Sequence, residues 1–235
     1  MNLAIMQPYF LPYLGYWQLM AASDVFVLYD NIEFTKKGWF HRNNILLNGE
    51  KKLFTLPLKQ GSDYLNVVER YLADDAGAAI NKILAQIKQS YRKAPYFDIA
   101  YPLVEKCFCY PQTNLFYFTE HSIQLLCQYL DIKCRIIRSS DISIDHNLRA
   151  EDKVIALCKA LGGSRYINAI GGVELYSDSS FQHSGVELCF LQSGLPAYPQ
   201  FGNEFIPYLS IIDLMMFNSQ QQLKEMLTDY SLIHK

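Results

Sequence analysis

The order of elements in the first 43 residues constrains the fold of this chain more than any other feature. An apolar strand is expected at residues 3–6, followed by a loop, a helical stretch and a second apolar strand at residues 24–29. Polar side chains gather directly after both strands. Ligands of open α/β sheets bind at the carboxyl ends of strands, so both halves of this segment are expected to face one pocket.

The composition is that of an ordinary globular protein. Half of the 235 residues are hydrophobic and 19% are charged, which predicts a sizeable core and one compact domain over residues 1–235. The net charge of −2 argues against non-specific nucleic-acid binding. Because no window of about 18 apolar residues and no basic signal-peptide start is found, no membrane span and a cytoplasmic location are expected.

Strands alternate with helices in both outer thirds of the chain. Further strands are expected at residues 45–47, 52–58, 133–139, 165–168 and 186–192, and helices at 76–91, 114–130, 150–161 and within 208–228. The segment 64–73 fits a strand or a helix, and Pro95 and Pro102 are expected to end or restart helices. This pattern predicts an α/β fold: a partly parallel sheet with flanking helices and a helical middle lobe at residues 76–131.

The loop after the first strand combines rigidity with aromatic side chains. Its prolines fix φ, Gly15 permits close approach of the backbone, and the Gln7 amide both donates and accepts hydrogen bonds. Tyr9 and Tyr13 add rings and hydroxyls. Such a loop would suit a sugar or a nucleotide; the alternative is a packed crossover that only connects strand to helix.

A basic and aromatic cluster follows the second strand. Lys36, Lys37 and Arg42 place three positive charges within seven residues, and Arg42 could bind a phosphate or carboxylate bidentately. Trp39 could stack on a base or a sugar ring. A solvated basic turn with an anchoring tryptophan is the alternative.

The same cluster holds candidate proton carriers. Asp30, at the end of the second strand, could act as a base or bind hydroxyls. His41 stands beside Arg42 and Asn43, which makes it a second candidate proton carrier and Asn43 a binding candidate.

A third element follows the strand at residues 165–168. Asn168 is followed shortly by Gly171 and Gly172, whose backbone N–H groups could form an anion-binding nest. The alternative is a plain turn from strand to helix. Further along, Ser210 is expected to cap a helix, with Asp213 at its third position.

The cysteines do not suggest a metal site. Cys107 and Cys109 form C-x-C rather than the C-x-x-C of zinc or redox motifs, and no His–Cys grouping has zinc spacing. The six cysteines are therefore expected to be reduced core thiols, and no structural metal is expected. Asp24 and Asp30 could still contribute to a transient Mg²⁺ site.

The N-terminal layout resembles nucleotidylyltransferases of the HIGH class, which have a Rossmann-like fold. Those enzymes stabilise the leaving pyrophosphate with histidines at the start of the first helix. Here Tyr16 follows Gly15 and the loop has no histidine, so the resemblance extends to fold rather than to that chemistry.

Over residues 2–218 the chain resembles the WbqC-like protein family. The motif is Q-P-x-x-L-P-x-x-G-Y, then D-x-x-x-x-x-D and K-x-x-W-x-x-R-N, with either Lys36 or Lys37 as the family lysine. These positions are Gln7, Pro8, Leu11, Pro12, Gly15, Tyr16, Asp24, Asp30, Lys36, Trp39, Arg42 and Asn43. The segments RYINAIGG and YPQF…FIPYLSIIDLMMFN add to the resemblance.

The resemblance implies a role in bacterial surface-polysaccharide synthesis, such as that of O-antigen. The leading hypothesis is a transferase, of aminoacyl or acyl type, that modifies a nucleotide-linked amino sugar. One alternative is nucleotidyl or adenylate-forming transfer, with a nucleotide or Mg²⁺ as cofactor. Another is a non-catalytic protein that binds a glycan intermediate or assembles pathway proteins. The aromatic content of 14% is also compatible with a homodimer.

Overall fold

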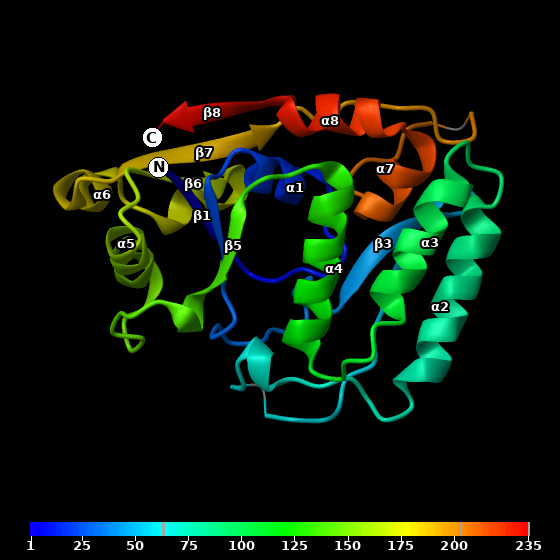
Figure 1. The fold of residues 1–235 in the computed structure, drawn as a ribbon, viewed down its shortest axis with the longest axis horizontal. Helices are drawn as coiled ribbons and strands as arrows, with labels where there is room; N and C mark the ends of the chain where they lie inside the picture. The colour runs from blue at the N-terminus through cyan, green and yellow to red at the C-terminus, as the bar shows by residue number, and fades with distance from the viewer. Residues whose placement is uncertain (63, 203, 235) are drawn as a thin grey trace.

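The computed structural model describes the whole chain except residues 63, 203 and 235. Its main sheet has six strands in the order β5-β2-β1-β6-β7-β8 (Figure 1). These neighbours pair in parallel, except that β8 runs antiparallel to β7. The strands are β1 (Asn2–Met6), β2 (Val25–Leu28), β5 (Arg135–Arg138), β6 (Arg165–Ala169), β7 (Glu187–Ser193) and β8 (Tyr230–His234). The predicted α/β fold with a partly parallel sheet is confirmed.

Helices cover both faces of this sheet. The α-helices of the described residues, including those of the helical lobe, are α1 (Leu14–Ala21), α2 (Ala76–Tyr91), α3 (Phe97–Phe108), α4 (Leu115–Leu130), α5 (Ala150–Ala160), α6 (Asp178–Ser184), α7 (Ile211–Phe217) and α8 (Gln220–Thr228). Successive residues of a strand point to opposite faces. Accordingly, Leu3 and Ile5 of β1 share a buried cluster with residues of α5 and α6, whereas Ala4 belongs to the cluster that contains α1.

The middle of the chain forms the expected helical lobe. Helices α2, α3 and α4 pack on one another, on α7 and on a separate hairpin, at the far end of the molecule from α5 and α6 (Figure 1). The hairpin consists of β3 (Arg42–Leu47) and β4 (Glu50–Thr55), as its sequence predicted. Asn114 caps α4 as expected, because its side-chain oxygen accepts from the backbone N–H of Phe116 at 3.0 Å. One buried apolar cluster runs from the sheet into this lobe.

Three details differ from the sequence predictions. Helix α3 continues through Pro102. The proline removes only one backbone N–H donor from the helix, and the packing of the buried face, which includes Ala100 and Val104, is kept. Residues 64–73 form neither a strand nor an α-helix; they contain a single 3₁₀ turn at Val67–Glu69. Strand β8 was not predicted, because it is a largely exposed edge strand without a clear apolar alternation.

The strand order creates a crevice at the centre of the sheet. Counted along the chain, the six strands follow the order 3-2-1-4-5-6 of a doubly wound fold, in which the direction of winding reverses between the first and fourth strands. Those strands are β1 and β6, and they pair only at Asn2–Arg165 and Leu3–Tyr166. By contrast, β6 and β7 pair over their whole common length. The carboxyl ends of β1 and β6 therefore separate, and this is where such folds bind ligands.

Candidate functional site

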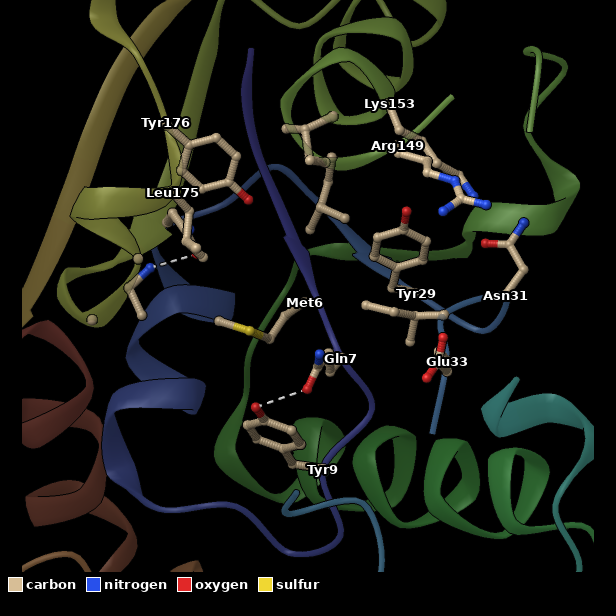
Figure 2. A pocket seen from close by; sticks show the side chains of 18 of the residues that line it. Met6, Gln7, Tyr9, Tyr29, Asn31, Glu33, Arg149, Lys153, Leu175 and Tyr176 are labelled. Carbon is tan, nitrogen blue, oxygen red and sulfur yellow. Dashed lines mark hydrogen bonds between the residues drawn. The ribbon is translucent and has the colours of Figure 1, made fainter. Parts of the chain in front are cut away.

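A cavity of about 850 Å³ opens at the carboxyl ends of β1, β2 and β6 (Figure 2). Met6 and Gln7 at the end of β1 line its centre, and Asn168 and Ala169 at the end of β6 line one wall. Tyr29, which follows β2, lines another. The site thus lies at the point where the sheet reverses its winding, as the sequence predicted for the first two strands.

The first loop supplies the aromatic part of the cavity. Tyr9 donates its hydroxyl hydrogen to Gln7 Oε1 at 3.0 Å, and Tyr16 donates to the Gln7 carbonyl at 3.0 Å (Figure 2). Both bonds fold the loop back onto the end of β1. Gly15 also lines the cavity, and a Cβ there would overlap the ring of Tyr13. Gly15 therefore allows the Tyr13 ring to lie against the start of α1 at the cavity wall.

The Asn-Ala-Ile-Gly-Gly segment at the end of β6 forms the opposite wall. Asn168 is buried, and its Oδ1 accepts from the backbone N–H of Ala169 at 2.9 Å. A Cβ on Gly172 would overlap the Asn168 amide, whereas a Cβ on Gly171 would meet nothing within 4 Å. Gly172 is thus required for the close packing of Asn168, while Gly171 leaves open space beside its backbone.

The start of α5 supplies a basic wall. Arg149 and Lys153 line the cavity and extend toward Tyr29 and Asn31 (Figure 2). Lys153 is only 5% exposed, its Nζ donates to the carbonyl of His146 at 3.3 Å, and it lies 5.0 Å from the centroid of the Tyr29 ring. Burial lowers the pKa of Lys153.

The backbone at this helix start is unusual. Ala150, which lines the cavity, has a φ of 45°, a left-handed conformation that a non-glycine residue rarely adopts. No side chain caps the amino end of α5. The first turn of α5 also carries Glu151 and Asp152, but Arg149 and Lys153 line the cavity whereas these two carboxylates are not among its described lining residues, so the wall itself favours an anion.

His146 is held in one tautomer at the cavity edge. Its Nε2 lies 3.0 Å from the carbonyl of Ile142, which can only accept, so Nε2 carries the proton. Nδ1 then accepts from the Asn31 amide at 3.0 Å. The Oδ1 of Asn31 in turn accepts from Ser139 at 2.7 Å. Both ring nitrogens are thus used within the protein, and this chain of bonds stiffens the wall beside Lys153.

Asp30, one predicted proton carrier, lies behind the cavity wall. Its buried carboxylate accepts from Ser139 Oγ at 2.7 Å and from the Ser140 N–H at 2.9 Å and Oγ at 2.5 Å. These bonds connect the end of β2 to the end of β5. Asp30 also interacts electrostatically with Lys153, whose pKa it raises against the effect of burial. Its contact with the cavity is therefore indirect.

His41, the other predicted proton carrier, is buried in the aromatic cluster of the loop. Its ring centroid lies 5.3 Å from that of Phe34. Burial, with the charges of Arg42 and Arg70, lowers the pKa of His41 to about 4. The histidine is therefore neutral near pH 7, and it is not among the described residues that line the cavity.

Of the basic and aromatic cluster, Trp39 reaches the cavity, with 39% of its surface exposed. Arg42 lies 5.5 Å from the centroid of the Trp39 ring and donates to the carbonyls of Gly38 and Lys37. Lys36 and Lys37 are exposed, and both lie outside the set of described residues around the cavity. The arginine thus holds the loop that carries the tryptophan.

Asn43 stabilises the backbone of the first loop by hydrogen bonds. Its Nδ2 donates to the carbonyls of Phe10 and Leu11 at 3.2 and 2.7 Å. Leu11 has a φ of 48°, so these bonds hold a loop residue in the left-handed region. Asn43 therefore supports the loop that carries the aromatic wall, and it is not among the described residues that line the cavity.

Sequence reasoning missed most of the basic wall. The described residues that line the cavity but were not singled out include Tyr29, Asn31, Glu33, His146, Asn147, Arg149, Lys153 and Tyr176. A usable signal was present, because the segment HNLRAEDK comes after the strand at residues 135–138 and contains the start of the next helix. Polar groups after that strand belong to the same edge of a parallel sheet as those after the first two strands.

Comparisons with known proteins agree with the extent of the fold. An "Uncharacterized protein Rv1507c" of Mycobacterium tuberculosis (strain ATCC 25618 / H37Rv) is 25% identical over 216 residues, which cover 91% of this chain and 92% of that protein. No solved structure matches. No helix in the described part of the chain has the length and apolarity needed to cross a membrane. The model of the WbqC-like protein family matches residues 7–225, and the chain belongs to that family.

Proposed function

We propose that this protein is a transferase of bacterial surface-polysaccharide synthesis that acts on a nucleotide-linked amino sugar in the cytoplasm. The observation that carries the proposal is a cavity with one basic and one aromatic wall at the winding reversal of a doubly wound sheet. Such crevices bind nucleotides in many α/β proteins. The volume of about 850 Å³ lies within the range of small-molecule sites, which is about 300–1,000 Å³.

The basic wall would bind the diphosphate. Arg149 could grip phosphate oxygens bidentately, Lys153 would add a point charge, and the uncapped start of α5 would direct N–H groups at the same anion. Lys36, Lys37 and Arg42, the sequence-based candidates for this role, would act at longer range by attracting the anionic ligand.

The aromatic wall would hold the base or the sugar. Tyr9, Tyr13 and Trp39 line this side, with Gln7 between them and the end of β1. Rings present faces for stacking, while the Gln7 amide and the tyrosine hydroxyls can bond to sugar hydroxyls. Asn168, Gly171 and Gly172 would contact the sugar from the opposite wall.

Lys153 is the best-placed group for proton transfer. In acyl or aminoacyl transfer, the amine of the sugar forms a C–N bond with the carbonyl carbon of an activated donor, and the bond to the leaving group breaks. The attacking nitrogen loses a proton, which Lys153 can accept only after its ammonium, the form that binds the diphosphate, has released its own proton. Burial favours the neutral form, while Asp30 limits the effect from behind the wall. Asp30 would thus act as a positioning residue.

Nucleotidyl or adenylate-forming transfer is a second candidate. The doubly wound strand order and the anion-binding helix start would serve a triphosphate as well as a nucleotide-sugar diphosphate. In that reaction ATP would bind, with Mg²⁺ as its counterion, and pyrophosphate would leave.

A thermal-shift panel with UDP-, dTDP-, GDP- and CMP-sugars, ATP and free nucleotides separates these candidates. A ligand at 100 times its Kd stabilises the folded protein by about 2.7 kcal/mol. We expect a shift with one nucleotide-sugar that is lost in Lys153→Met and kept in Lys37→Ala. Mass spectrometry of that ligand with acyl donors then reports transfer.

The other outcomes are informative. A shift with ATP alone would favour nucleotidyl transfer. A shift with a nucleotide-sugar but no transfer to it with any donor would favour a non-catalytic binding protein. No shift with any nucleotide would contradict the proposal.

A further inference from the structure

Three side chains of types that commonly ligate metals lie close together at the end of the sheet opposite the cavity. They are Glu187 and Cys189 of β7 and His234 of β8. One ligand atom from each residue lies within 4.8 Å of the other two. The cluster is located at the amino end of β7, whereas the cavity opens at the carboxyl ends of the parallel strands.

Strand register brings these side chains together. Residues 187 and 189 are two positions apart on one strand, so their side chains project from the same face. The antiparallel pairing of β7 with β8 places His234 directly opposite Cys189. Since the backbone hydrogen bonds of the sheet fix this arrangement, the three ligand atoms are held near one another without a flexible loop.

The distances fit tetrahedral coordination. Cys189 Sγ lies 3.6 Å from His234 Nδ1, and that nitrogen lies 3.3 Å from Glu187 Oε1. Zinc binds sulfur at about 2.3 Å, nitrogen at about 2.0–2.1 Å and carboxylate oxygen at about 2.0–2.2 Å, which in a tetrahedron separates S and N by about 3.5 Å and N and O by about 3.3 Å. The S–N and N–O separations in the structure are close to these two edges of a tetrahedron.

Arg165 orients the carboxylate of this cluster, and two of its three side chains are open to solvent. Arg165 on β6 donates its Nε–H to Glu187 Oε2 at 2.6 Å, which orients the carboxylate and leaves Oε1 directed at the histidine. Cys189 is buried, while the side chains of Glu187 and His234 are 39% and 65% exposed, so an ion can enter from solvent.

Space remains for a fourth ligand. The cluster is open to solvent on the side of Glu187 and His234, whose side chains are partly exposed. A water molecule or an external donor could complete the coordination there. Three protein ligands with one open position are typical of zinc sites that bind water or a substrate.

We propose that Glu187, Cys189 and His234 form a binding site for Zn²⁺ or a similar soft divalent cation that fastens β8 to β7. Binding replaces the proton of the Cys189 thiol, so the metal is held by a thiolate, an imidazole nitrogen and a carboxylate. The sequence did not indicate this site, because Cys189 and His234 are distant in the chain and only the β7–β8 register makes them neighbours. The proposal is independent of the cavity and of its ligand.

Titration of untagged, metal-free protein with Co²⁺ tests the site. We expect one Co²⁺ per chain and a near-ultraviolet absorption band from thiolate-to-cobalt charge transfer, with Zn²⁺ displacing the cobalt. Cys189→Ser should abolish the band, and His234→Ala should weaken binding at least tenfold. Cys109→Ser, which alters an exposed cysteine, should leave both unchanged.

The same experiment can overturn the proposal. It is refuted by the absence of a thiolate band in the native protein, or by a band that persists in Cys189→Ser. His234→Ala provides an independent readout if Cys189→Ser folds poorly, because His234 is exposed near the end of an edge strand. Unchanged Co²⁺ affinity in that variant would also exclude the site. Circular dichroism of each metal-free variant identifies loss of folding.

Discussion

Two basic clusters of this protein look alike in sequence and differ in position. Lys36, Lys37 and Arg42 lie close together in the chain, yet the lysines are exposed and the arginine bonds to the carbonyls of its own loop. Arg149 and Lys153 are four residues apart, and both line the cavity. The local density of charge was the stronger sequence signal, but the position relative to the strand ends decides which cations can meet a ligand.

The comparison divides residues into two groups with different expected behaviour. Residues of the basic wall should affect ligand binding with little effect on stability. Residues of the loop cluster and its supports, including Asp30 and His41, should affect stability first. Each prediction below tests one side of this division.

The largest effect is expected from removing both cavity cations. Each charge-assisted hydrogen bond contributes about 2 kcal/mol, so Arg149→Ala combined with Lys153→Met should weaken nucleotide-sugar binding by about 4 kcal/mol, or about 1,000-fold. Calorimetric titration measures this. The matched control, Lys36→Ala with Lys37→Ala, should change Kd less than about threefold. Equal losses in the two double variants would remove the distinction between the clusters.

Asp30→Ala should destabilise the fold by about 3 kcal/mol. The substitution leaves the N–H and the hydroxyl of Ser140 without their acceptor and removes the bonds that connect the end of β2 to the end of β5. Urea unfolding monitored by circular dichroism gives the free energy. Asp141→Ala, which removes an exposed carboxylate nearby, serves as the control. If Asp30→Ala kept full stability but lost turnover, Asp30 would instead act directly in the chemistry.

Alanine substitution at the two glycines after β6 should change the stability by smaller and unequal amounts. Gly172→Ala should cost about 1 kcal/mol of stability, because the new methyl group displaces the buried Asn168 amide from the cavity wall. Gly171→Ala should be nearly neutral, since its Cβ meets open space within the described structure. Thermal unfolding of the two variants gives the comparison. A larger loss in Gly171→Ala would show that the wall is packed differently.

The smallest effect is expected from replacing His41, which should change how the free energy of unfolding depends on pH. Its pKa is about 4 in the folded protein, below the value of about 6.5 in an unfolded chain. Between these values the unfolded state binds the proton and the folded state does not, so stability present above pH 6.5 is lost as the pH falls toward 4. His41→Phe should reduce this loss by about 0.7 kcal/mol between pH 7 and pH 6. Identical pH dependence of the two proteins in urea unfolding would contradict a buried, neutral histidine.

Several features followed from local sequence alone. The apolar strands, the helices at residues 76–91 and 114–130, the Asn-Gly hairpin and the Asn114 cap all depend on neighbouring residues, and the structure has each of them. The aromatic wall was also foreseen in part, because Gln7 and Tyr9 follow the first strand directly. Local periodicity and turn chemistry are sufficient for such elements.

Other features depended on tertiary structure. The cavity forms because β1 and β6 pair only at their first residues, and no local pattern encodes that separation. Asp213 was expected to serve a helix start, yet its buried carboxylate accepts from Tyr91 at 2.8 Å and Tyr198 at 2.6 Å, residues from distant segments.

The sequence by itself therefore determined most of the elements of this protein, their α/β class and part of one wall of its cavity. Only the tertiary structure decided which cations line the cavity and which thiol lies opposite a histidine. The physical reason is that helices and strands form from interactions between residues near in the chain, whereas strand order and register bring together side chains that are far apart in it.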